Sequence, residues 1–584
     1  MPPPDSGRSA LASYTPDLTF RVTNFKSIAS VELPASRLVV LAGSNSSGKS
    51  SLLQAALFMT QSLAAETPVI NGDLVILGEP KDVIRDGTKD VSFEFSFDFT
   101  GPEEESIERI AYRVTLAESK GELKPSQVSL FSEGELAFCA QNKSCPADLS
   151  KRISARETVL RLKNAEDLNL PEESFLTVIG MQPARLVYRA SEEYLRRSFD
   201  ELLKAPMPDY MLQELLFELM RGYRSTEVPD PLRERISDLQ HGRVAFRGDA
   251  AQLSPPEADA LFGVYAESIA PNGWASEGIT MPPLGRGSAF RSSFAARPAE
   301  GSLVFPLIGQ MDEAAGKMRG FRNSVVYLGP LRDDPRVAYP LGHTVSNLPV
   351  GGKGEFTAAF LDKNRLRRIS YRDPEGHATS GTLIAAASEW CRYLGIAEKV
   401  SVSAKAKLGH ELSLELDGHS RDPTAIGVGA SQLLPVVITV LGAKKGQLIL
   451  LEQPELHLHP KVQSRLADFF AFARPDVQIL VETHSEYLIT RLRVRAAEGV
   501  LDPSEVAALF VSKRKGEVVP AEEGEQPETP EFYSEFKPLT LDDLGNFNAW
   551  PEDFFDSLER DSVELARAVT DRLRESHGDD NEKE

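Results

Sequence analysis

Residues 38–53 read LVVLAGSNSSGKSSLL and contain the pattern Gly-x-x-x-x-Gly-Lys-Ser. An apolar, β-branched run ends at Gly43, small polar residues follow, and an apolar helical pattern begins at Lys49. This order predicts a strand, a phosphate-binding loop and a helix, because the glycines let the backbone wrap closely around an anion that the loop amides face. Lys49 is expected between the β- and γ-phosphates, and the Ser50 hydroxyl on Mg²⁺. The predicted triphosphate site comprises Gly43, Ser44, Asn45, Ser46, Ser47, Gly48, Lys49, Ser50 and Ser51.

The composition indicates a cytoplasmic protein. Its 584 residues contain no run of 18 apolar residues, and the first residues lack the order of a signal peptide, so no membrane segment is expected. The three cysteines, Cys139, Cys145 and Cys391, have no metal-ligand spacing. A net charge of -21 argues against binding nucleic acid through bulk electrostatics, although a local basic groove remains compatible with it.

Alternating strands surround the predicted loop. Two short strands are expected over 18–25 and 29–34, and the runs VSFEFSFDF (91–99) and IAYRVTL (110–116) alternate apolar and polar residues at hairpin distance. Another hairpin is expected from 400–406 and 411–416. The pattern predicts an antiparallel layer that flanks an α/β sheet carrying the loop.

Two short apolar strands supply further candidate residues. QLILL (447–451) ends at Glu452, and QILV (478–481) is followed closely by His484. An acidic residue at the end of a buried strand beside the loop strand suits Mg²⁺, so Glu452 is the predicted metal-side carboxylate. His484 is placed to sense the γ-phosphate.

A second anion-binding helix start is predicted within IGVGASQLLPVV (426–437). Gly427 and Gly429 permit a tight backbone, Ser431 is a good N-cap residue, and an apolar helix follows. With one phosphate loop in the chain, this second site is explained by a dimer in which it caps the partner's γ-phosphate. An ordinary helix cap at a domain joint is the alternative.

Taken together, the order of these motifs resembles the ATP-binding-cassette-type heads of SMC, RecF and OLD-like ATPases. More narrowly, it resembles bacterial predicted ATPases that carry EQPELHLHP (452–460) and end in Trp-Pro-x-x-Phe-Phe (550–555). NFKSI (24–28) and LGPLR (328–332) also match that family. The resemblance implies ATP and Mg²⁺ as cofactors, and a homodimer that sandwiches ATP between the phosphate loop of one protomer and the signature motif of the other. It places that motif on Gly429, Ser431 and Gln432, with Ser50 and Glu452 at the metal.

The sequence departs from this pattern at the residue after Glu452. A glutamate usually acts there as general base, but Gln453 is an amide and can only orient the attacking water. Glu455 is the nearest replacement carboxylate. Since loss of a general base removes a factor of about 10²–10⁴, slow turnover and a long-lived ATP-bound dimer are expected. The signature also lacks Ser-Gly-Gly-Gln.

The predicted fold is α/β, an ABC/SMC-type P-loop NTPase head with a mixed sheet and a flanking antiparallel layer, interrupted by a compact, mostly helical insertion. The predicted boundaries are a disordered leader (1–16), the first part of the head (17–119), the insertion (120–320), the second part of the head (321–515), a family-specific segment (516–570) and a disordered acidic tail (571–584).

Three functions remain open on the sequence alone. The first is a slow ATPase that acts as a switch for a separate effector such as a nuclease, in Septu-like anti-phage defence. The second is a RecF-like repair ATPase that binds DNA, supported by the basic stretches KNRLRRISYR (363–372) and RLRVR (491–495). The third is an ATP-locked scaffold in which Gln453 has abolished hydrolysis.

Overall fold

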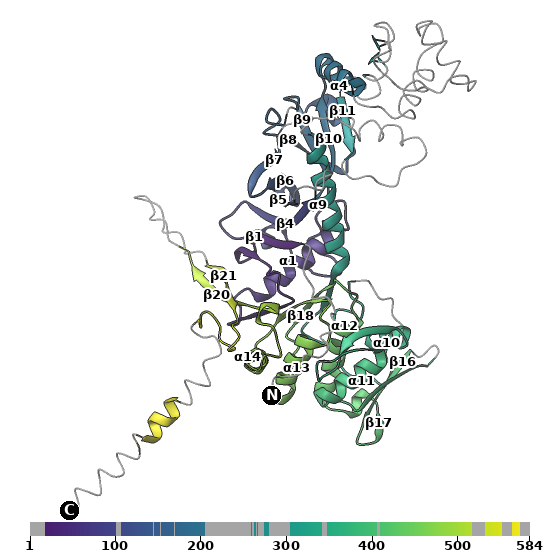
Figure 1. The fold of residues 1–584 in the computed structure, drawn as a ribbon, viewed down its shortest axis with the longest axis vertical. Helices are drawn as coiled ribbons and strands as arrows, with labels where there is room; N and C mark the ends of the chain where they lie inside the picture. Colours follow the sequence, from purple (N-terminus) through teal and green to yellow (C-terminus); the bar gives the residue numbers. More distant parts are fainter. Residues whose placement is uncertain are drawn as a thin grey trace, which may run out of the picture.

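The computed structural model is shown in Figure 1. It describes residues 18–100, 107–204 except 144, 152 and 169, parts of 258–266, residues 274–278, 304–340, 347–405, 409–516 and 532–551, and parts of 563–572. These residues form one 16-stranded mixed sheet and two small antiparallel sheets.

Five parallel strands form the part of the large sheet that carries the phosphate loop. The loop strand β3 is flanked by β20 on one side and by β19 on the other, so β19 separates β3 from β18. In spatial order the strands are β20 (Val506–Lys515), β3 (Leu38–Gly43), β19 (Gln478–Glu482), β18 (Leu448–Glu452) and β12 (Val325–Leu328).

Both faces of this parallel layer are buried, which explains why its strands are mostly apolar; the exposed end of β20, from Lys513 to Lys515, is the exception. Successive side chains of a strand point to opposite faces. Val39 and Leu41 accordingly enter one core cluster, which also holds the phosphate-loop helix, while Val40 and Ala42 enter a second cluster. The second cluster contains a helix that is buried almost all round over 430–442.

Helices cover both faces of these parallel strands. The phosphate-loop helix α1 (Lys49–Ser62) packs into the first core, and the remaining helices of this part contribute to the second. The latter are α10 (Thr357–Asn364), α11 (Leu383–Leu394), α12 (Val428–Gly442), α13 (Pro460–Phe472) and α14 (Glu486–Ala497), with short 3-10 turns η4 (Pro423–Ala425) and η5 (Pro503–Glu505).

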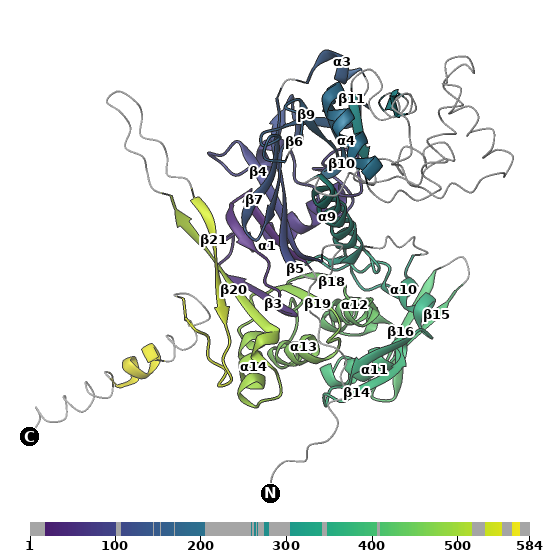
Figure 2. The same ribbon diagram turned by 45° about the horizontal axis from the view of Figure 1, so that its top comes forward.

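The antiparallel part of the large sheet continues from the parallel part through a hairpin. β20 pairs with β21 (Phe532–Thr540), and β21 meets β2 (Ile28–Glu32) at Ser534 and Ile28. Figure 2 shows this hairpin running out from the parallel strands. Beyond β2 the order is β1 (Thr19–Phe25), β4 (Asp90–Thr100), β5 (Ile107–Ser119), β6 (Glu122–Ser132), β7 (Glu135–Gln141), β8 (Glu157–Leu162), β9 (Ser174–Ile179), β10 (Gln182–Arg189) and β11 (Trp274–Gly278).

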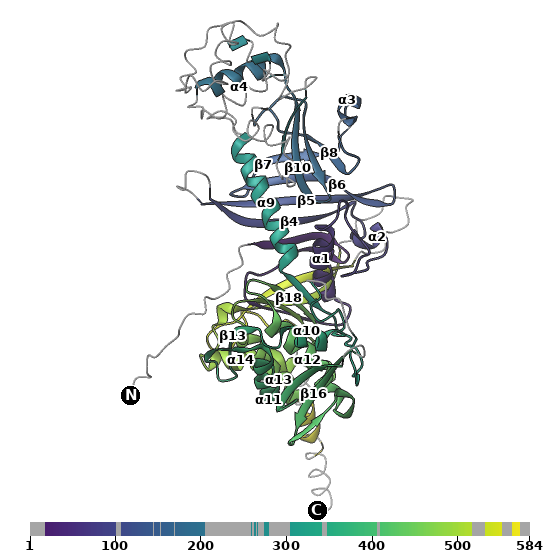
Figure 3. The same cartoon turned by 90° about the vertical axis from the view of Figure 1, so that its right-hand side faces the viewer.

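One long helix, α9 (Val304–Ser324), lies across the antiparallel strands, as Figure 3 shows. Its Phe321 ring stacks on Phe20 and meets Phe95 edge-on, with centroids 5.3 Å apart in both pairs. Phe93, Phe95 and Phe97 are fully buried on the same face of β4. The other helices near this layer are α2 (Pro80–Val83), α3 (Ala147–Ser150) and α4 (Glu192–Lys204).

The prediction of a mostly helical insertion over 120–320 is wrong for the described residues 122–189, which form five strands of the same sheet. Lys120-Gly121 and Glu133-Gly134 all have positive φ, the conformation of the two-residue turns that suit twisted hairpins. Residues 205–257 lie outside the described part. The domain boundaries themselves stay a prediction.

The predicted α/β fold with a mixed sheet is confirmed. The expected strands at 18–25, 29–34, 91–99 and 110–116 are present, and β15 (Lys399–Ala404) pairs with β16 (His410–Leu416) as expected. The small sheets also contain β17 (His419–Arg421), β13 (Arg368–Arg372) and β14 (Ala378–Thr382). Among the described residues, no helix is both long and apolar enough to cross a membrane.

Candidate functional site

The phosphate loop has the predicted strand–loop–helix geometry. Gly43 ends β3 with φ 143°, and a Cβ there would lie 2.1 Å from the Val511 carbonyl oxygen. Gly48 precedes α1 with φ 102°, and a Cβ there would lie 2.1 Å from Ser534 Oγ. Both positions therefore exclude any side chain, because the backbone is left-handed and the space is filled.

The start of α1 is suited to an anion. Its first turn contains no acidic residue, and Gly48 offers no side chain to cap the helix amides. Lys49 is buried, and its Nζ donates to the carbonyl oxygens of Gly43 at 3.0 Å and Ser44 at 2.8 Å. Burial lowers the pKa of Lys49, while the charges of Glu482 and Glu455 oppose that shift.

The antiparallel pair β20–β21, which lies next to β3 in the sheet, contacts the phosphate loop. Ser534 of β21 donates to the Ser47 carbonyl oxygen, and its hydroxyl lies 2.7 Å from that of Ser27. These contacts were not predicted, because residues 487 and 507 positions apart meet only through the β2–β21 pairing. Ser47 Oγ is itself buried and has no hydrogen-bond partner within the described residues.

Three glutamates gather at the carboxyl ends of β18 and β19. Parallel register places Glu452 opposite Glu482. Glu482 is 3% exposed, and its Oε1 accepts a hydrogen bond from Ser50 Oγ at 3.0 Å. No role was predicted for Glu482, because the strand order β3–β19–β18 cannot be read from the local sequence pattern.

Glu452, the predicted metal-side carboxylate, has a partner on the other side. Its Oε1 accepts a hydrogen bond from the Tyr327 hydroxyl of β12 at 2.9 Å. Burial and then the neighbouring charge of Glu482 raise the pKa of Glu452 to about 7, against the opposing effects of Tyr327 and Arg332. Burial thus favours the protonated form of this carboxyl, and a bound cation would lower its pKa.

Because the pKa of Glu452 is higher in the folded chain than its ordinary value of 4.5, the folded state binds that proton more tightly. Stability should therefore fall as pH rises from about 4.5 to 7, and Glu452→Gln should remove this contribution. In EDTA the variant should gain about 1–3 kcal/mol over wild type at pH 8, shrinking toward pH 5. Denaturant unfolding at both pH values measures the gap; a gap independent of pH would contradict the assignment.

Glu455, the predicted replacement base, is 6% exposed and accepts a hydrogen bond from the His484 amide at 2.6 Å. Burial raises the pKa of Glu455, and the His484 amide opposes that shift. Its Oε2 is buried without a hydrogen-bond partner in the described part of the chain. His484 is largely exposed, but the part of its ring that is desolvated, and then the Lys49 charge, lower its pKa.

Arg332 of the LGPLR stretch holds the end of β18 in place and was also missed as a site residue. Its buried guanidinium donates to the carbonyl oxygens of Gln453 at 2.8 Å, Glu452 at 3.0 Å and Pro330 at 2.9 Å. Burial lowers its pKa to about 10, opposed by Glu455 and Glu452. Gln453 is in the left-handed region with φ 42°, and these bonds fix that turn.

The predicted signature helix exists, but Ser431 is not its N-cap. α12 begins one turn earlier, after Gly427, and the Ser431 hydroxyl donates back to the Val428 carbonyl oxygen at 2.8 Å. Gly429 packs close to the His457 carbonyl oxygen, and the buried Gln432 amide reaches the Asp333 carbonyl oxygen at 3.5 Å. The helix start thus contacts both the 330–333 loop and the segment after β18.

The donor set fits a Mg²⁺–nucleotide. Mg²⁺ prefers oxygen ligands, and a hydroxyl and two carboxylates converge beside an amide-rich helix start and a lysine. Buried oxygens of Ser47, Glu455 and Glu482 have free hydrogen-bonding capacity as far as the described residues go. When bound, the metal would neutralise phosphate charge beside Ser50.

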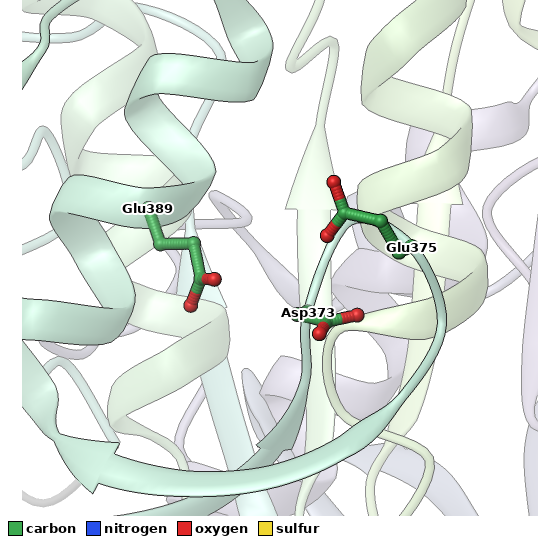
Figure 4. Close-up of side chains that lie close together, drawn as sticks. All are labelled: Asp373, Glu375 and Glu389. Carbon is green, nitrogen blue, oxygen red and sulfur yellow. The ribbon is translucent and has the colours of Figure 1, made fainter.

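A separate group of carboxylates lies between the β13–β14 turn and the middle of α11 (Figure 4). Ligand atoms of Asp373, Glu375 and Glu389 lie within 4.8 Å of one another. Tyr371 donates to Glu389 at 2.6 Å, and the His377 amide donates to Asp373 at 2.8 Å. Because these bonds already engage two of the three carboxylates and Glu375 is exposed, the group is not part of the candidate site.

One family model matches a short part of the chain. Residues 403–490 match the family model described as "AAA domain, putative AbiEii toxin, Type IV TA system". The match covers α12, β18, α13 and β19 with Glu452 and His484. No curated protein matches the chain.

Solved SMC heads are among the structures that match. They include an Smc head bound to the C-winged helix domain of ScpA (TM-score 0.31, covering 90% of this chain and 97% of that chain). A head with an extended coiled coil bound to the C-terminal domain of ScpA, from Pyrococcus furiosus, gives 0.29 (95% and 98%), and one with a coiled coil and joint from Pyrococcus yayanosii gives 0.30 (90% and 96%). Sequence identity is 12% in each case.

Proposed function

We propose that the chain is a slow Mg²⁺-dependent ATPase that dimerises around ATP and switches a separate effector protein. The observation that carries this proposal is the phosphate loop itself, with its Ser50 hydroxyl bonded to a buried carboxylate at the end of the neighbouring strand. A glycine turn before an ordinary helix would not need a buried lysine and three glutamates around it.

In this proposal the loop residues 43–51 bind the phosphates, and Lys49 contacts the β- and γ-phosphates. Glu452 supports the metal, Gln453 orients the water, and His484 senses the γ-phosphate. Glu455 takes the role of the base that position 453 lacks, since it is the carboxylate held against the His484 backbone. Slow proton transfer favours a long-lived ATP-bound state, as a switch requires.

ATP binding provides the test. Lys49→Ala should weaken Mg²⁺–ATP binding about tenfold or more, because a charge-assisted contact to the phosphates is lost. Lys445→Ala, which removes an exposed lysine between α12 and β18, is the matched control and should bind like wild type. Equilibrium binding of a fluorescent ATP analogue gives the affinity of wild type and of both variants. Equal affinity of all three proteins would contradict a nucleotide site at the phosphate loop.

The start of α12 supports the dimer. Its first residue, Val428, is 52% exposed, and Leu331, which is 68% exposed, lies two residues before the Asp333 carbonyl that the Gln432 amide contacts. Exposed apolar side chains around a helix start that can bind an anion suit a surface that closes on the partner's nucleotide.

Ser431→Arg should therefore abolish ATP-dependent dimerisation while the monomer still binds ATP, because the bulky side chain blocks the partner's phosphates. Ser420→Arg, on the exposed strand β17, is the control for adding an arginine. Light scattering with and without ATP gives the mass. A Ser431→Arg variant that still doubles its mass with ATP would count against this arrangement.

The effector is proposed to be a separate protein, such as a nuclease in an anti-phage system. Direct DNA binding receives less support, because the arginines of 491–495 are engaged within the chain. Arg491 and Arg495 both donate to the buried Asp468 carboxylate, and Arg493 donates to the Gly545 carbonyl oxygen.

A further inference from the structure

Glu482 lies one strand closer to the phosphate loop than Glu452 does. β19 is inserted between β3 and β18, and the register places Leu41, Glu482 and Glu452 side by side across the three strands. The carboxylate nearest the loop helix is therefore the one on β19. It comes from a residue that follows the apolar run QILV, not from the EQPE stretch.

The hydrogen bond between Ser50 and Glu482 places this carboxylate beside the expected metal ligand. Ser50 Oγ, the hydroxyl placed to bind a nucleotide's metal, donates to Glu482 Oε1 at 3.0 Å. A hydroxyl and a carboxylate that share a proton at this distance can instead share a divalent cation, since both are oxygen ligands. Glu452 instead accepts its bond from Tyr327, on the side away from β3.

The second oxygen of Glu482 is also available. Oε2 is buried and lacks a hydrogen-bond partner among the residues that the structure describes. Lys49, whose charge acts on Glu482, gives its hydrogen bonds to the carbonyl oxygens of Gly43 and Ser44. A buried carboxylate with an open oxygen requires a compensating positive charge, which Lys49 at longer range supplies only in part.

We propose that Glu482, together with Ser50, is the direct protein ligand of the divalent cation, and that Glu452 acts on that cation from the next strand. The inference rests on the proposed function, since the cation would arrive with a nucleotide. The inference assigns the metal-binding carboxylate to Glu482 on β19, the strand next to β3, and not to Glu452 at the end of β18, which the sequence motif indicates.

Mn²⁺ binding tests the inference without relying on activity. Electron paramagnetic resonance titration of the full chain, with and without a non-hydrolysable ATP analogue, gives the Mn²⁺ affinity of wild type and variants. Glu482→Gln keeps the size of the side chain and an oxygen for Ser50 but removes the charge. It should weaken Mn²⁺ binding tenfold or more, whereas Glu452→Gln should weaken it less than threefold.

Glu389→Gln is the control for the carboxylates of Figure 4 and should leave Mn²⁺ binding unchanged. An equal or larger loss in Glu452→Gln than in Glu482→Gln would overturn the inference, as would a wild type that binds no Mn²⁺. Binding of the analogue without metal reports separately on the proposed function. A wild type that binds the analogue while Glu482→Gln retains full Mn²⁺ affinity would reject the metal assignment alone.

Discussion

Glu455→Gln is expected to slow ATP turnover by about 10²–10⁴-fold while ATP binding stays within about twofold of wild type. The Glu455 carboxylate accepts a hydrogen bond from the His484 amide at 2.6 Å. Glutamine retains an oxygen that can accept the same bond, so the backbone around the site should keep its geometry. Only the capacity to take a proton is lost. Single-turnover hydrolysis and analogue binding measure the two effects.

Glu398→Gln, an exposed glutamate before β15, is the control and should turn over ATP like wild type. Undiminished hydrolysis in Glu455→Gln would remove Glu455 from the base role. A loss of binding that parallels the loss of turnover would instead assign Glu455 to holding the site together.

Arg332→Leu is expected to destabilise the chain by about 3 kcal/mol and to reduce ATP turnover. The substitution removes three hydrogen bonds from a buried cation, including those to the carbonyl oxygens of Glu452 and Gln453, and leaves Gln453 with the longer bond from the Leu456 amide at 3.3 Å. Since Gln453 is held in a left-handed turn, the end of β18 should lose its defined position. Denaturant unfolding and phosphate release measure the two consequences.

The neighbouring Arg336 provides a matched comparison. Its guanidinium pairs with Asp333 at 2.6 Å and is 49% exposed, so Arg336→Leu should change stability by less than about 1 kcal/mol. Arg332→Lys should not restore wild-type behaviour, because an ammonium group cannot reproduce the planar fork of donors. Equal destabilisation by both leucine variants would contradict the role given to Arg332.

The parts of the site that follow one another along the chain were predictable from the sequence. The strand, loop and helix around Lys49 have strong local signals, and so do the short apolar strands that end near Glu452 and His484. Each requires only a run of apolar residues and the residue type that follows it.

The contacts that depend on strand order were not predictable in this way. Glu482 reaches Ser50 only because β19 is inserted between β3 and β18, and Ser534 reaches the Ser47 carbonyl oxygen only because β21 pairs with β2. The strands at 122–189 were missed for a different reason. Their Lys-Gly and Glu-Gly turns are a local hairpin signal, whereas a mostly helical insertion was expected over 120–320.

Phosphate release from ATP by the purified wild-type chain, compared with Lys49→Ala and Lys445→Ala, tests the central claim most directly. The account predicts slow, Mg²⁺-dependent release by wild type and Lys445→Ala, and none above background by Lys49→Ala. Release that survives in Lys49→Ala, or its absence from wild type, would contradict an ATPase centred on this loop.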